Sequence, residues 1–257
     1  METEFVLFDF DGVIANTEES NAAYLEKALS AFGIQLTDDD RKALIGTNDK
    51  TRIESLLSRS LVKVTAEDLA GKRRQVGNTY ENSCIRPMPG VVSLIQEIRG
   101  RGMKTGLVTS TSTRLIMIAL NRMRMTALFD VVICGDMCAN HKPDPECYKK
   151  AMDYLGAEPC KCIVFEDSAV GIHAARLAGA RVAAYRGSGI QQDVSEADLI
   201  VDSYDECKDM LDDIMQGKIT QGRITPVSYT HLVRSGTGIW PVLAGKYLYP
   251  RPVLLYH

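Results

Sequence analysis

No apolar stretch in this 257-residue chain approaches the roughly 20 residues that a membrane-spanning helix requires. An excess of basic residues is also missing, because 30 Lys and Arg stand against 33 Asp and Glu, and the formal net charge is −3. Without a positive field, binding to a nucleic-acid backbone is not expected. A signal peptide is not expected either, since the first strand-like run begins at Phe5. We therefore expect a cytoplasmic protein that acts without membrane or nucleic acid.

Cysteine and histidine are too scattered to predict a zinc centre or a disulfide framework. The chain has four His and seven Cys, and the odd number of cysteines favours reduced thiols. Cys160 and Cys162 stand close together, but no second Cys or His pair accompanies them to complete a four-ligand site. A metal, if one is bound, is expected on oxygen ligands.

Short apolar runs recur along the chain, and each of them leads into polar residues. The runs cover 5–8, 104–108, 131–134, 162–165, 181–185 and 199–201. Helical patterns separate them at 91–99, 113–122, 145–155 and 169–178. Strands that alternate with helices predict an α/β fold with a doubly wound, Rossmann-like parallel sheet. Ligands of such sheets bind beyond the carboxyl ends of the strands, where these polar residues lie.

A helical insertion is expected directly after the first strand. Amphipathic or charged helical patterns cover 21–32, 38–44, 50–61 and 66–76, and no convincing strand interrupts them. Asn16, with Glu19 three residues on, predicts a capping box at the first of these helices. We expect a catalytic core of residues 1–16 and 86–216, with a small α-helical cap at 17–85.

The segment 217–257 differs in composition from the rest of the chain. It contains no Asp or Glu, but it holds four of the nine prolines and the single tryptophan, Trp240. The run 226–232 resembles adaptor read-through at the end of an assembled gene fragment. An authentic, poorly packed extension is the alternative. We expect this segment to lie outside the fold.

Two aspartates at the end of the first strand predict phosphoryl-transfer chemistry. Asp9 and Asp11 are two residues apart, so an extended backbone places both carboxylates on the same side. One carboxylate can attack phosphorus while the other protonates the leaving oxygen and then deprotonates a water molecule. Gly12 permits a tight turn and a close approach of the backbone to phosphate. An ordinary Asp-Gly turn is the alternative for this motif taken alone.

Further polar residues follow three other predicted strands. Thr109 and Ser110 can hold phosphate oxygens or simply begin a helix, and Lys142 can offset negative charge or be an ordinary surface lysine. Glu166 and Asp167 offer hard oxygen ligands for magnesium, or else an acidic pair before a helix. Their common position at one sheet edge favours the functional alternatives.

In this order the residues resemble the four motifs of the haloacid dehalogenase superfamily, over residues 4 to about 215. The resemblance implies that Asp9 is the nucleophile and Asp11 the acid/base. It also implies that Thr109 binds phosphate and that Lys142 is the third motif. The implied magnesium ligands are Asp9, Asp11 through its backbone carbonyl, Glu166 and Asp167.

The branch that contains beta-phosphoglucomutase and sugar-phosphate or phosphoglycolate phosphatases is the most similar. It implies a small phosphorylated metabolite as partner and substrate contacts from Gly12, Ser110 and the cap residue Thr47. The cap departs from the mutase pattern, since Asn21 and the loop 46–49 stand where a His and an Arg would be expected. We therefore expect magnesium-dependent hydrolysis of a phosphate monoester. A mutase is the first alternative; a phospho-accepting signalling module and a dehalogenase are less favoured, and the oligomeric state stays open.

Overall fold

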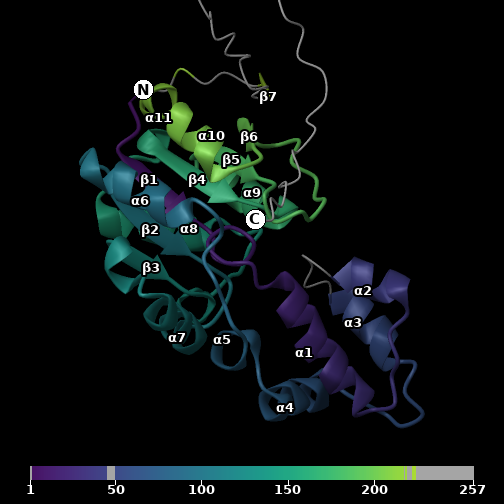
Figure 1. Ribbon diagram of the computed structural model, residues 1–257. Helices are drawn as coiled ribbons and strands as arrows, with labels where there is room; N and C mark the ends of the chain where they lie inside the picture. Colours follow the sequence, from purple (N-terminus) through teal and green to yellow (C-terminus); the bar gives the residue numbers. More distant parts are fainter. Residues whose placement is uncertain (1, 45–49, 217, 219–221, 224–257) are drawn as a thin grey trace, which may run out of the picture. The chain divides into compact units, whose positions relative to one another are not determined.

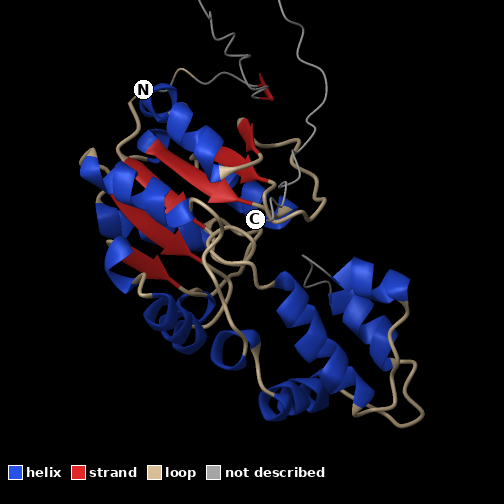
Figure 2. Cartoon of the chain, viewed as in Figure 1, coloured by secondary structure: helices blue, strands red, loops and turns tan. Residues whose placement is uncertain are grey.

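The computed structural model describes residues 2–44, 50–216, 218 and 222–223. Within them, seven parallel strands form one sheet in the order β3-β2-β1-β4-β5-β6-β7 (Figure 1, Figure 2). The strands are β1 Phe5–Phe8, β2 Lys104–Val108, β3 Val131–Ile133, β4 Cys162–Glu166, β5 Arg181–Tyr185, β6 Leu199–Val201 and β7 Gly222–Arg223. Because β1 pairs with both β2 and β4, the first strand lies inside the sheet.

The strands read as continuous apolar runs because helices cover both faces of the sheet. In β1, Val6 and Phe8 pack in one apolar cluster, and Phe5 and Leu7 pack in the other. The first cluster includes residues of α6 Val91–Gly100, α7 Thr113–Met123, α10 Tyr204–Asp209 and α11 Leu211–Met215. The second includes residues of α8 Glu146–Leu155 and α9 Ala169–Leu177. Three short 3-10 helices are also present, Thr126–Leu128, Gly135–Met137 and Pro159–Lys161.

The predicted α/β fold with a doubly wound parallel sheet is confirmed. All six predicted strands are present, although β3 ends one residue earlier and β4 one residue later than the apolar runs indicate. β7 was not predicted, and its two residues belong to the segment 217–257 that composition sets apart. The chain divides into two compact units, Met1–Thr225 and Pro226–His257, and the second lies outside the described residues. No helix in the described ranges is long and apolar enough to cross a membrane.

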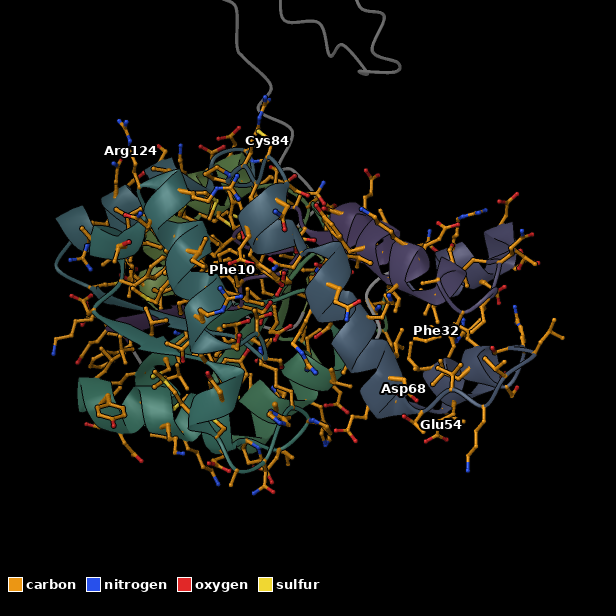
Figure 3. The ribbon with its side chains drawn as sticks, turned by 90° about the horizontal axis from the view of Figure 1, so that it is seen from below. Phe10, Phe32, Glu54, Asp68, Cys84 and Arg124 are labelled. Atoms are coloured by element: carbon orange, nitrogen blue, oxygen red, sulfur yellow. The ribbon has the colours of Figure 1, made fainter. Side chains whose placement is uncertain are left out.

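The insertion after β1 folds as helices with an apolar cluster of their own. They are α1 Glu18–Ser30, α2 Asp38–Leu44, α3 Lys50–Leu57, α4 Ala66–Val76 and α5 Thr79–Asn82. Leu25, Leu29, Leu56 and Leu69 belong to this cluster, so the helical cap does not depend on the sheet for its core. In Figure 3, Phe10 lies among the side chains of the α/β part, whereas Phe32, Glu54 and Asp68 lie on the cap.

The predicted capping box at Asn16 is wrong. The N-cap position of α1 is Thr17, whose side chain makes no capping hydrogen bond. The Thr17 hydroxyl instead donates to a carboxylate oxygen of Asp11. A functional contact has therefore replaced the usual cap, whereas α4 keeps a complete capping box between Thr65 and Asp68.

Candidate active site

The carboxyl ends of β1, β2 and β4 bring the predicted site residues to one edge of the sheet. The register pairs Phe8 of β1 with Leu107 and Phe165, so Asp9 lies level with the last residues of both neighbouring strands. The Asp9 N–H donates to the Phe165 carbonyl at 2.9 Å, which continues the ladder by one residue. This pairing fixes the backbone of Asp9 before its side chain leaves the sheet.

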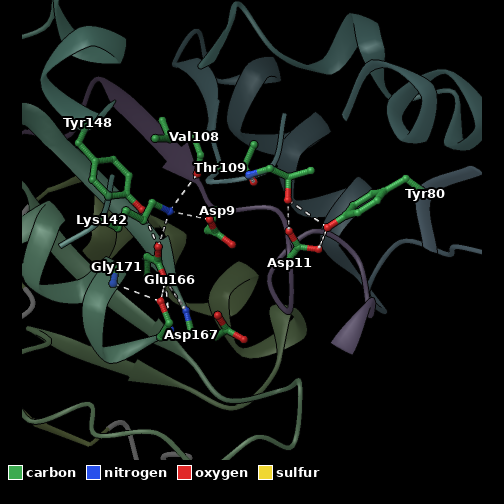
Figure 4. A network of polar contacts seen from close by, with 12 residues as sticks. Asp9, Asp11, Tyr80, Val108, Thr109, Lys142, Tyr148, Glu166, Asp167 and Gly171 are labelled. Carbon is green, nitrogen blue, oxygen red and sulfur yellow. Dashed lines mark hydrogen bonds and ion pairs between the residues drawn. The ribbon is translucent and has the colours of Figure 1, made fainter. Parts of the chain in front are cut away.

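Lys142 lies between two buried carboxylates. Its Nζ is 2.6 Å from Asp9 Oδ1 and 2.7 Å from Glu166 Oε1, and it also donates to the Val108 carbonyl at 3.2 Å (Figure 4). The ammonium lies 4.9 Å from the centre of the Tyr148 ring. Burial alone would lower the pKa of Lys142, but the two carboxylates raise it well above its usual value. Only 5% of the side chain is exposed, so this lysine is no ordinary surface residue.

Asp9 has one carboxylate oxygen engaged and one available. Lys142 binds Oδ1, and no hydrogen bond from the described residues uses Oδ2. Burial raises the pKa of Asp9 to about 8, although the Lys142 ammonium acts in the opposite direction. The structure therefore holds a buried, oriented carboxylate with one oxygen free to act on a ligand.

Both carboxylate oxygens of Glu166 accept hydrogen bonds. Its Oε1 accepts from Lys142 and from the Tyr148 hydroxyl at 2.8 Å, and its Oε2 accepts from Asp167 N–H, Ser168 N–H and the Ser168 hydroxyl. Burial would raise the pKa of Glu166, but Lys142 and these donors hold it below its usual value. A Cβ on Gly171 would lie 1.8 Å from Oε1, so glycine is required there. Glu166 thus contacts Ser168, the N-cap residue of α9, as the helix-end alternative expects, and its role as a metal ligand stays a prediction.

Three carboxylates form a group that fits a hard divalent cation. Asp9, Glu166 and Asp167 each place an oxygen within 4.8 Å of the others. Burial, and then the nearby carboxylates, raise the pKa of Asp167 well above its usual value. Gly12 has φ +79°, and a Cβ there would lie 1.9 Å from Asp167 Oδ2. The Asp167 carboxylate thus fills the space that a side chain at position 12 would need, so glycine is required there.

The Asp11 carboxylate lies outside this group and points to the opposite side of Asp9 from Lys142 (Figure 4). Its Oδ1 accepts from Thr17 and from the Tyr80 hydroxyl at 2.7 Å, and its Oδ2 accepts from the Thr111 hydroxyl at 3.0 Å. The two aspartates thus follow one strand but face different partners. A contact of Asp11 with metal through its backbone carbonyl, as the family resemblance implies, stays a prediction.

Comparison with known proteins identifies the family. The family profile described as haloacid dehalogenase-like hydrolase matches residues 6–185. The chain belongs to the haloacid dehalogenase-like hydrolases. The predicted resemblance to this family is confirmed, and so is the prediction that the chain is a hydrolase.

Relatives in this hydrolase family include enzymes named for sugar phosphates. A phosphorylated carbohydrates phosphatase of Thermotoga maritima is 30% identical over 176 residues, which are 68% of this chain and 82% of the relative. An N-acetylmuramic acid 6-phosphate phosphatase of Pseudomonas aeruginosa is 28% identical, over 82% of this chain and 96% of the relative. The crystal structure of CbbY from Rhodobacter sphaeroides in complex with phosphate has a TM-score of 0.68 and 27% identity, covering 80% of this chain and 96% of that one.

The other predicted site residues of this hydrolase have different surroundings. Thr109 is buried, and its hydroxyl accepts from Thr111 N–H at 3.1 Å, whereas Ser110 is exposed. Thr109 does not begin the next helix, because the N-cap of α7 is Ser112. Thr47 lies outside the described residues.

Four residues of the site were missed by sequence reasoning. Three are the hydroxyl donors to Asp11, and the fourth is the Tyr148 donor to Glu166; they are Thr17, Tyr80, Thr111 and Tyr148. Tyr80 is 69 residues from Asp11 and follows no strand, so no local pattern marks it. Tyr148 reads as a core residue of α8, although it follows Lys142 by less than two helical turns.

Proposed function

We propose that this hydrolase cleaves a small phosphate monoester of the sugar-phosphate or phosphoglycolate type, through a phospho-aspartate at Asp9. One observation carries the proposal: the Asp9 carboxylate is buried and fixed by Lys142 through Oδ1, while no hydrogen bond from the described part of the chain reaches Oδ2. The names of the relatives support this class of substrate. A fructose-1-phosphate phosphatase of Escherichia coli, 26% identical over 68% of this chain, gives further support.

The proposed chemistry has two steps that share the same residues. In the first, Asp9 Oδ2 attacks phosphorus, the bond to the leaving oxygen breaks, and Asp11 gives that oxygen a proton. In the second, Asp11 takes a proton from water and the water oxygen attacks the phosphorus of the phospho-aspartate. The bond between Asp9 Oδ2 and phosphorus breaks, which regenerates the Asp9 carboxylate and releases inorganic phosphate. Lys142 stays paired with Glu166 throughout and offsets negative charge near the transferred group.

Magnesium is the proposed cofactor. Asp9, Glu166 and Asp167 would hold it, with the backbone carbonyl of Asp11 as a further ligand. When bound, it would neutralise charge on the phosphate oxygens. A phosphate-release screen over sugar phosphates, phosphoglycolate, polyol phosphates and nucleotides, with and without magnesium, tests the proposed function. Absence of release from every monoester would overturn it.

Metal removal should destabilise the protein increasingly as the pH rises. Asp9 keeps its proton up to about pH 8 in the metal-free fold, but up to only about pH 4 when unfolded. A raised pKa in the folded state contributes stability at low pH that is lost as the pH rises through the folded value. In chelator, the free energy of unfolding should therefore fall between pH 5 and 8.

Magnesium competes with these protons, so its stabilising effect should grow over the same interval. Thermal unfolding at several pH values, with chelator or with magnesium, measures both trends. Turnover should vanish in chelator and return with magnesium but not with calcium, whose looser coordination fits the site poorly. A magnesium effect on unfolding that is equal at pH 5 and pH 8 would contradict the assignment of Asp9 as a ligand.

Water, rather than a second hydroxyl of a sugar phosphate, is the proposed acceptor in the second step. A mutase must hold a second phosphate over the site, and this needs cationic groups in the cap. Asn21, in α1, stands where the mutase pattern has a histidine, so one of the expected groups is missing. The predicted role of the loop 46–49 lies outside the described residues.

We expect stoichiometric release of phosphate from a monophosphate, without interconversion of hexose 1- and 6-phosphates. The absence of interconversion should persist when a bisphosphate activator is added, because Asn21 stands where the mutase pattern has a histidine to hold the second phosphate. Phosphorus NMR follows both products in one sample. Isomer exchange faster than phosphate release would favour the mutase alternative.

A further inference from the structure

A cluster of three hydroxyls surrounds the Asp11 carboxylate, and each hydroxyl comes from a different segment. Thr17 precedes the first cap helix, Tyr80 lies in α5, where the chain returns from the cap, and Thr111 lies in the loop after β2. The hydroxyls of Tyr80 and Thr111 each donate to Asp11. These two hydroxyl oxygens also lie 3.0 Å from each other. Both oxygens of the carboxylate are therefore held from fixed directions.

Core helix α7 anchors the backbone that carries Tyr80. Arg122 of α7 donates to the Tyr80 carbonyl at 2.5 Å and to the Ser83 carbonyl at 2.7 Å. Arg114, also in α7, pairs with Glu81 at 2.5 Å. The Tyr80 ring belongs to the main apolar cluster and lies 6.1 Å from the ring of Phe10, the residue between the two aspartates. These contacts leave the Tyr80 hydroxyl little freedom to move.

We propose that Tyr80 is a positioning residue that holds the Asp11 carboxylate at the leaving group, and that Arg122 fixes Tyr80 for this task. The proposal rests on the proposed function. In an in-line displacement the leaving oxygen departs on the side of phosphorus opposite to the nucleophile, so the acid must stand away from Asp9. The Asp11 carboxylate lies apart from that of Asp9, on the opposite side of Asp9 from Lys142 (Figure 4).

The Tyr80 hydroxyl is suited to hold Asp11 without taking part in proton transfer. The Tyr80 hydroxyl donates to Asp11 Oδ1 at 2.7 Å, so it acts on this carboxylate as a hydrogen-bond donor. Asp11 gives a proton to the leaving oxygen in the first step and takes one from water in the second. Throughout this cycle Tyr80 remains a neutral donor that fixes direction only.

Tyr80→Phe tests the proposal through its dependence on the leaving group. Protonation matters most for a leaving oxygen of high pKa, such as that of a sugar, and least for an activated phenol. In Tyr80→Phe, kcat/KM for a sugar phosphate should fall about 10- to 100-fold, less than full loss of a general acid, and for an activated aryl phosphate by less than about twofold. The plot of log kcat/KM against leaving-group pKa should therefore be steeper than in wild type. Asp11→Asn removes the proposed acid itself, so its plot shows the steepest slope that loss of protonation can give.

Tyr204→Phe is the matched control, because it removes a buried tyrosine hydroxyl that donates to the Val13 carbonyl at 2.7 Å instead of to Asp11. Its slope should equal that of wild type. An equal loss on all esters in Tyr80→Phe, or no loss, would overturn the proposal. If Tyr80→Phe does not fold, Arg122→Gln supplies the same measurement, and an unchanged slope there overturns it as well. If the Asp9→Asn variant turns over substrate as fast as wild type, the proposed function itself fails.

Discussion

Asp9→Asn should lose nearly all turnover while the fold is kept. An amide is a poor nucleophile, so the first step fails, and losses for a removed nucleophile reach about a thousandfold or more. The fold should tolerate the change because burial already favours an uncharged group at Asp9, whose pKa is raised to about 8. Lys142 keeps its partner Glu166 in the variant. Initial rates of phosphate release, together with thermal unfolding, measure both expectations.

Asp153→Asn serves as the matched control for this substitution. Asp153 is an exposed residue of α8, so the same change of chemistry occurs far from the strand ends that form the site. Its turnover should equal that of wild type. If Asp9→Asn retains more than about a tenth of wild-type turnover, Asp9 is not the nucleophile.

The fold was predictable because its signals are local. Each strand of the sheet's interior is a short apolar run that ends in polar residues, and Gly156 ends α8 in the left-handed conformation that favours glycine. Asp9, Lys142 and Glu166 were predictable because parallel strands end at one edge of the sheet. Asp9 and Glu166 end neighbouring strands, whereas β2 separates β3 from β1, so the loop after β3 must bring Lys142 to both carboxylates.

The surroundings of Asp11 were not predictable in the same way. The end of a strand predicts where the backbone of Asp11 lies. It does not predict which side chains donate hydrogen bonds to the Asp11 carboxylate. Thr17 resembles an ordinary residue at a helix start, and Tyr80 resembles a core aromatic of a short helix. Only the return of the chain from the cap brings both hydroxyls to Asp11, and that contact depends on packing rather than on sequence spacing.

Lys142→Met should cost both stability and turnover. The substitution removes the buried ammonium between Asp9 and Glu166, so two carboxylates lose their paired charge in a site with little exposure. Breaking one side of a buried ion pair typically costs about 3–5 kcal/mol of the free energy of unfolding, because the remaining charge is uncompensated. Turnover should fall as well, since nothing then orients Asp9 Oδ1 or offsets charge near the phosphoryl group.

The pH dependence separates a lost ion pair from lost packing. Lys142 lowers the pKa of both Asp9 and Glu166, so without it both pKa values should be higher than in wild type. The charged carboxylates that remain as the pH rises then lack a partner, and stability is lost. The destabilisation by Lys142→Met should therefore be larger at pH 8 than at pH 5, and magnesium should reduce it by supplying positive charge to the same carboxylates. Lys150→Met is the control, because Lys150 pairs with Glu146 at 2.8 Å but is substantially exposed and screened by solvent. Chemical denaturation of both variants at the two pH values is the measurement. An equal, pH-independent cost in the two would mean that the buried lysine acts through packing of its chain, and not through its charge.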